Sequence, residues 1–115
     1  MTEIDPDRLA NELAADADVI RSLRDNGDMS SIVRPVDVRL IGSAENIRCL
    51  ADGITGSEWR VVQIVDLDGG EVAADIQRDQ TTEATALKAL TVDALRLETK
   101  FLVRYDGWGT VAKVG

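Results

Sequence analysis

A central hairpin organises this sequence, and residues 59–78 read WRVVQIVDLDGGEVAADIQR. Residues 59–66 are rich in strand-forming side chains, and residues 72–78 alternate between apolar and polar side chains, as two strands would. Between them lies Asp68-Gly69-Gly70, in which glycine supplies the positive φ that a tight turn needs. Because this glycine pair joins two strands, and not a strand and a helix, it predicts a hairpin and not a phosphate-binding loop.

Before the hairpin, a strand and then a helix are expected. Residues 36–40 alternate as Val-Asp-Val-Arg-Leu, the pattern of a half-buried strand. Ser43 follows as the expected N-cap of a helix, which Gly53 and Gly56 close. Four apolar residues share the buried face of that helix: Ile47, Leu50, Ala51 and Ile54.

After the hairpin, a second helix and a last strand are expected. Thr81 or Thr82 is the predicted N-cap of this helix, and residues 101–105 are the predicted strand. The apolar stripe of the helix consists of Leu87, Leu90, Ala94 and Leu97.

A further helix is expected at about residues 6–25, ahead of these elements. Asp5 is its predicted N-cap, Pro6 occupies its first position, and Asn26-Gly27-Asp28 ends it. Its apolar stripe consists of Leu9, Leu13, Ala17, Ile20 and Leu23.

The whole order is therefore a helix followed by a βαββαβ unit at about residues 33–114. This predicts an α+β, ferredoxin-like sandwich in a single domain of residues 1–115, with two helices on one face of a four-stranded antiparallel sheet. The first helix packs at an edge of the sheet or partly covers its open face, and both alternatives stand. That open face should carry polar side chains, including charges of both signs: Asp37, Arg39, Asp75, Gln77, Arg104 and Asp106.

Composition narrows the possible functions. The chain has 21 acidic and 13 basic residues, no histidine and a net charge of −8. The acidic balance argues against direct binding to nucleic acid, and the two central strands carry no aromatic residues on which bases could stack. Without histidine, the chain lacks the commonest general base and metal ligand. We therefore expect a protein partner, no cofactor and no enzymatic activity.

The lack of long apolar runs and the single cysteine bear on the cellular location. No apolar run approaches the roughly 20 residues of a membrane span, and the N-terminal residues are acidic where a secretory signal is basic. A lone Cys49 fits a reducing compartment, so the cytoplasm is expected. We expect Cys49 to pack beneath another element, since nothing near it in the sequence would activate a thiol.

An alternative function rests on three aspartates. Asp37, Asp75 and Asp106 could converge on the open face and hold a divalent cation, which would make the chain a small carboxylate-dependent metal-binding or hydrolytic protein. Cross-strand ion pairs with Arg39 and Arg104 would account for the same residues without any chemistry.

The most distinctive stretch is Tyr105-Asp106-Gly107-Trp108-Gly109-Thr110. Two glycines beside a tryptophan in a strand permit a bulge that re-aims the Trp108 ring. The ring then either caps the core or anchors a partner, since tryptophan is enriched at the centres of protein interfaces. The sequence supports both readings equally.

This stretch closely resembles the signature of the RraB-like family, the regulators of ribonuclease E activity B. Residues 19–28 and 33–37 resemble that family's first helix and the entry to its first strand. The resemblance implies a non-catalytic regulator that binds ribonuclease E, or another RNA-processing enzyme, outside its catalytic centre. The partner-binding residues that we expect are Tyr105, Asp106, Gly107, Trp108, Gly109, Asp16, Asp18 and Asp25. The oligomeric state stays open, and self-association through the open face of the sheet or through an edge strand is a third possibility.

Overall fold

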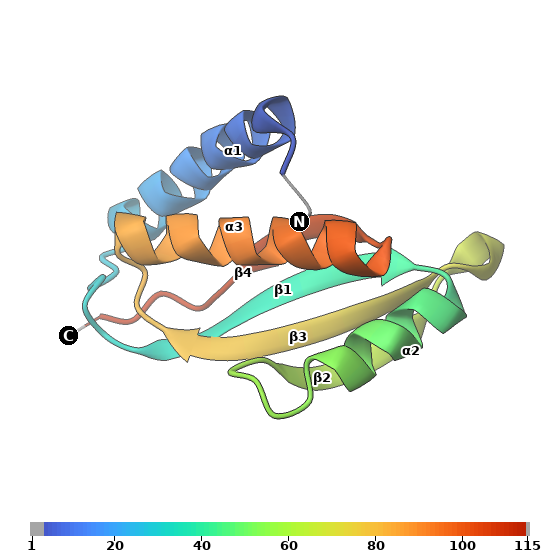
Figure 1. Ribbon diagram of the computed structural model, residues 1–115. Helices are drawn as coiled ribbons and strands as arrows, with labels where there is room; N and C mark the ends of the chain where they lie inside the picture. The colour runs from blue at the N-terminus through green and yellow to red at the C-terminus, as the bar shows by residue number, and fades with distance from the viewer. Residues whose placement is uncertain (1–3, 115) are drawn as a thin grey trace.

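The computed structural model describes residues 4–114 and confirms the expected order of a helix followed by βαββαβ (Figure 1). The elements are α1 (Pro6–Asp25), β1 (Arg34–Gly42), α2 (Ala44–Gly53), β2 (Arg60–Asp66), the short 3₁₀ turn η1 (Asp68–Gly70), β3 (Val72–Gln80), α3 (Ala84–Phe101) and β4 (Arg104–Gly109). Asp5 and Ser43 cap α1 and α2 through their side chains, as the sequence predicts. Among the described residues, no helix has both the length and the apolar character needed to cross a membrane.

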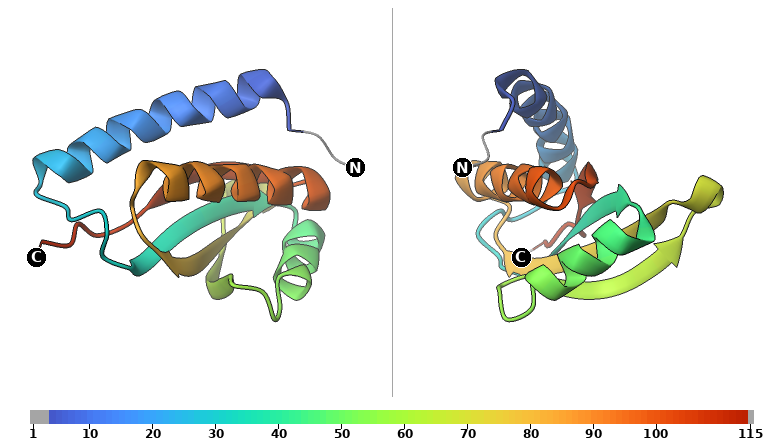
Figure 2. Two further views of the ribbon diagram at one scale, coloured as in Figure 1. Left: turned by 60° about the vertical axis from the view of Figure 1, so that its left-hand side comes forward. Right: turned by 45° about the vertical axis from the view of Figure 1, so that its right-hand side comes forward.

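The strands form one antiparallel sheet in the order β2-β3-β1-β4. Helices α2 and α3 lie on the same face of this sheet (Figures 1 and 2). The predicted hairpin joins β2 to β3 at the edge of the sheet through η1. The ferredoxin-like α+β architecture is therefore confirmed.

The alternation of side chains divides the sheet as expected. The apolar residues that alternate with the expected open-face residues are all buried, and they are Val36, Val38, Leu40, Val72, Ala74, Ile76, Val103 and Tyr105. Their polar neighbours lie on the other face, where Asp37, Arg104 and Asp106 are exposed. A period of two along each strand thus gives one apolar and one polar face.

Helix α1 packs against α3 on the helical side of the sheet and leaves the open face uncovered (Figure 2). Arg8 reaches from α1 to Glu98 on α3 and to the backbone of Tyr105 on β4, so α1 lies beside the β4 edge. Four residues of the stripe predicted for α1 are at least half-buried, and they are Leu9, Leu13, Ile20 and Leu23; the exception is Ala17, which is exposed while its neighbour Asp16 is buried.

The boundary between α3 and β4 differs from the one that the sequence predicts. Residues 101–105 were expected as a strand, but α3 runs to Phe101 and β4 begins at Arg104. Phe101 packs against the core as the last apolar residue of the helix. Leu102 then adopts a left-handed conformation, φ 55° and ψ 48°, which ends α3.

Two smaller predictions are also wrong. Neither Thr81 nor Thr82 caps α3, which begins at Ala84, and Thr82 is instead fully buried with its hydroxyl donating to the carboxylate of Asp28. The expectation that Cys49 packs beneath another element fails as well. Its side chain is exposed on α2, because it lies off the face that carries Ile47 and Leu50.

Candidate functional site

A bulge in β4 decides where Trp108 points. Tyr105 pairs with Leu40 and Trp108 pairs with Val38, so the register between β1 and β4 shifts by one residue between these pairs. Gly107 is the extra residue and has a φ of 97°, a conformation that glycine adopts without strain. Without it, Trp108 would face the open side of the sheet. With it, Trp108 turns to the helical side, as the expected bulge predicts.

The Trp108 ring meets a buried acid of α1. Its Nε1–H donates to Asp16 at 2.7 Å, and the Thr91 hydroxyl of α3 donates to the same carboxylate at 2.5 Å. Asp16 is only 5% exposed, whereas Trp108 is half-buried and packs against the core. Trp108 therefore joins α1 to the rest of the fold while part of its ring stays accessible.

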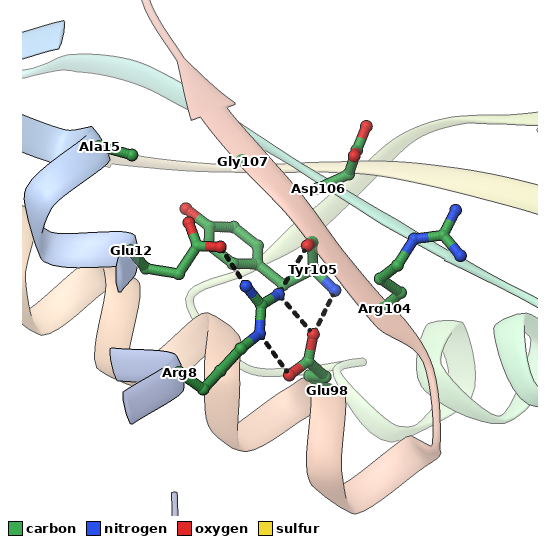
Figure 3. Close-up of a pocket in the computed structure, with 8 residues that line it drawn as sticks. All are labelled: Arg8, Glu12, Ala15, Glu98, Arg104, Tyr105, Asp106 and Gly107. Atoms are coloured by element: carbon green, nitrogen blue, oxygen red, sulfur yellow. Dashed lines mark hydrogen bonds and ion pairs between the residues drawn. The ribbon is translucent and has the colours of Figure 1, made fainter. Parts of the chain in front are cut away.

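A groove of about 560 Å³ opens beside this contact, between α1, α3 and β4 (Figure 3). In it Arg8 donates to Glu98 at 2.9 Å and to the Tyr105 carbonyl at 3.0 Å, while Glu98 accepts the Tyr105 N–H at 2.7 Å. The hydrogen bond that Arg8 donates to Glu98 raises the pKa of Arg8. Arg104 and Asp106 point away from this pair, on the other side of β4 (Figure 3).

The open face of the sheet carries a network of paired polar side chains. Arg39 binds Asp75 through two hydrogen bonds, of 2.7 and 2.9 Å, and Gln63 donates to the same carboxylate at 2.7 Å. The bond from Arg39 lowers the pKa of Asp75. Gln77 donates to Asp37 at 2.8 Å. Cross-strand pairing is therefore sufficient to explain why Asp37 and Asp75 lie on the open face.

The three aspartates of the metal-binding alternative do not form one cluster. Within residues 4–114, no group of three or more acidic, cysteine or histidine side chains is arranged so that it could hold a metal ion. Asp75 is already engaged by Arg39, and the structure offers no observation that favours this alternative.

Comparison with protein families gives one match. The model of the family "Regulator of ribonuclease activity B", RraB, matches residues 13–110. The chain belongs to the RraB family. The family resemblance expected from the sequence is thus confirmed, and the family's description is regulation of ribonuclease activity. Compared with curated proteins, the chain has no significant match.

The remaining expected contact residues of this RraB-family chain differ in accessibility. Asp106, Asp18 and Asp25 are exposed, Gly107 and Gly109 are half-buried, and Tyr105 is buried. Asp18 forms an exposed ion pair with Arg21 at 3.1 Å. Asp16 is buried beneath Trp108, so it is not available at the surface to bind a partner.

A second buried acid, Asp28, was not identified as important from the sequence. Its carboxylate accepts hydrogen bonds from the Arg34 guanidinium, from Thr82 at 2.5 Å and from the Lys113 N–H at 2.8 Å. Burial by itself would raise the pKa of Asp28, but the bonds from Thr82, Lys113 and Arg34 lower it to about 2. Asp28 thus joins the end of α1 to the segments before α3 and after β4.

Arg8, Glu98 and Arg34 were also missed. Arg8 and Glu98 are 90 residues apart in the chain, and Arg34 is 2% exposed despite its charge. No local pattern indicates such pairs. The weak signal available was the alternation of β1, which places Arg34 on the same face as the buried Val36 and Val38.

Proposed function

We propose that this protein is a non-catalytic regulator that binds a ribonuclease, with ribonuclease E or a related RNA-processing enzyme as the candidate partner. Membership of the RraB family carries the proposal, because that family is described as regulating ribonuclease activity. We further propose that residues 1–115 act as a single domain in the cytoplasm and need no cofactor.

The distribution of charge supports a basic protein surface as the partner. The chain carries a net charge of −8, and the carboxylates of Asp106, Asp18 and Asp25 are exposed. Acidic groups at a surface attract basic partners over about 8 Å at physiological ionic strength and accelerate their association.

The proposed contact surface is centred on β4. Asp106 lies on the open face and the accessible part of Trp108 lies on the other, with the Gly107 bulge between them. Asp18 and Asp25 on α1 extend the acidic surface. Tyr105, Gly107 and Gly109 serve this surface by fixing the path of the strand, and Asp16 serves it by holding the Trp108 ring.

Calorimetric titration of purified ribonuclease E with this protein tests the proposal. We expect saturable binding that weakens as salt is added. Asp106→Lys and the double variant Asp18→Lys/Asp25→Lys should each weaken binding several-fold, because they reverse charges at the contact. Asp52→Lys is the matched control, since Asp52 is an exposed acid on α2.

Absence of binding by the parent protein would reject ribonuclease E as the partner. If the parent binds and neither Asp106→Lys nor Asp18→Lys/Asp25→Lys weakens binding, the β4-centred contact surface is rejected and ribonuclease E is retained as the partner.

A further inference from the structure

Helix α1 buries little apolar surface on the rest of the fold. Among residues 6–25, all of which the structure describes, Leu23 is the only apolar side chain that is buried. The one other buried residue is an acid, Asp16. Helix α3, by comparison, buries five of its 18 residues. Because burial of apolar surface is the main force that docks a helix, α1 is held less firmly than α3.

The N-terminal half of α1 does not close against β4. The groove of about 560 Å³ lies between Arg8, Glu12 and Ala15 of α1 and the residues around Gly107 of β4 (Figure 3). Arg8 spans this groove to Glu98 on α3, and its side chain is 33% exposed. An ion pair that is open to water stabilises a fold only slightly, since water and salt screen it.

Beneath α1 lies a buried hydroxyl that has no hydrogen-bond partner. The Tyr105 side chain is 3% exposed, and its ring extends from β4 toward α1 (Figure 3). Among the described residues no group bonds to its hydroxyl, and the neighbouring Thr91 hydroxyl gives its proton to Asp16. Burial and then the charge of Asp16 raise the pKa of Tyr105, as expected for a phenol covered by this helix. A buried polar group without a partner destabilises the state that buries it.

The C-terminal end of α1 is anchored to the fold by a separate set of bonds. Arg24 donates to the Thr82 carbonyl at 2.8 Å, and Asp28 accepts the Thr82 hydroxyl at 2.5 Å. Between them Gly27 adopts a φ of 80°, which glycine reaches without strain. A few residues at the end of an element are the usual place for a hinge, so residues 26–28 can serve as a pivot for α1.

We propose that α1 is a hinged arm, which undocks from α3 and β4 while the βαββαβ unit stays folded. Opening turns about residues 26–28, breaks the bonds of Arg8 and Asp16, and gives the Tyr105 hydroxyl to water. The unpartnered hydroxyl makes the docked state less favourable, so the arm opens more often than its contacts alone would allow. Once undocked, a helix of 20 residues is only marginally stable in water, so its amides exchange with solvent.

Opening of the arm takes the proposed contact surface apart. Asp18 on α1 shares one surface with Trp108 and Asp106 on β4 only while α1 is docked. This consequence rests on the proposed function: a ribonuclease that binds the docked form shifts the population toward it and slows opening. The opening itself is measured in the free chain, so the arm and the proposed function can fail separately.

Native-state hydrogen exchange of the free chain, followed by mass spectrometry at low urea concentrations, tests the proposal. Exchange of α1 should depend weakly on urea, because opening of the arm exposes little surface, whereas exchange of β1 and β3 should depend strongly. Ile76→Val is the matched control, since Ile76 is fully buried in β3 and its replacement weakens the core. It should accelerate exchange in β1 and β3 and leave α1 at the parent rate.

Tyr105→Phe tests whether the buried hydroxyl favours opening. Without the hydroxyl the docked state no longer buries an unpartnered group, and the open state is nearly unchanged. Exchange of α1 should therefore slow about tenfold. Circular dichroism checks that the fold of the variant is intact.

Exchange of α1 that shares the urea dependence of β1 and β3, or that accelerates with them in Ile76→Val, would overturn the proposal, because α1 would then open only with the whole fold. Exchange of α1 that Tyr105→Phe leaves unchanged or accelerates would overturn it as well. Opening that is seen in the free chain but not slowed by bound ribonuclease would keep the arm and reject only its consequence for binding.

Discussion

Individual buried carboxylates hold distant parts of this chain together. Asp28 accepts bonds from Thr82, 54 residues away, and from the Lys113 backbone, 85 residues away. The sequence identified Asp28 only as the exit from a helix and Thr82 only as a possible cap, because both are common local roles for these residue types. Pairings over such separations have no local signature, so the sequence could not reveal them.

Replacing Asp28 should change how stability depends on pH. Its pKa of about 2 in the folded chain lies below its ordinary value of 3.8, so the ionised form stabilises the fold above pH 3.8, by about 2 kcal/mol. This contribution is lost as the pH falls from 3.8 toward 2. Urea unfolding at pH 6 and at pH 2.5 should show that Asp28→Asn is much less stable than the parent at pH 6 and closer to it at pH 2.5.

Asp25→Asn serves as the control for Asp28, since it removes a neighbouring but exposed acid and should change little at either pH. A stability difference between Asp28→Asn and the parent that is equal at both pH values would contradict the role assigned to ionised Asp28.

At the scale of elements, periodicity predicted most of the architecture but not the ends of α3 and β4. The apolar residues of the 101–105 region are typical of a strand, yet Phe101 completes the buried stripe of α3 and the left-handed Leu102 ends the helix. The same apolar residues can extend a helix or begin a strand, and the packing partners of each side chain decide which of the two forms. The position of α1 was open for the same reason, since its contacts with Glu98 and Trp108 come from the far end of the chain.

Helix α1 should loosen when its buried acid is removed. Asp16→Ala leaves the Trp108 Nε1–H and the Thr91 hydroxyl without their acceptor, which should cost about 1–3 kcal/mol. Hydrogen exchange followed by mass spectrometry should show faster exchange in α1 and little change in α2. The control is Asp18→Ala, because Asp18 is an exposed acid on the same helix.

If α1 exchanges at the parent rate in Asp16→Ala, then Trp108 does not hold the helix in place. The Tyr105–Thr110 segment would then be better explained by its exposed atoms than by packing.

At the scale of the whole molecule, the protein is a sheet covered on one face and polar on the other. Strand alternation predicted both faces correctly, including the charges of Asp37 and Asp106 on the open side. The contact of Arg8 with the Tyr105 carbonyl on the outer side of β4 was not predictable, because it depends on where α1 packs. The candidate surfaces thus follow from the arrangement of elements more than from any single motif.

Cleavage of RNA by purified ribonuclease E, measured as this protein is added in increments, tests the central claim most directly. The cleavage rate should change in a saturable way as the two proteins approach equal concentration, and this protein alone should cleave no RNA. A cleavage rate that is unchanged at a large excess of this protein, or RNA cleavage by this protein alone, would contradict it.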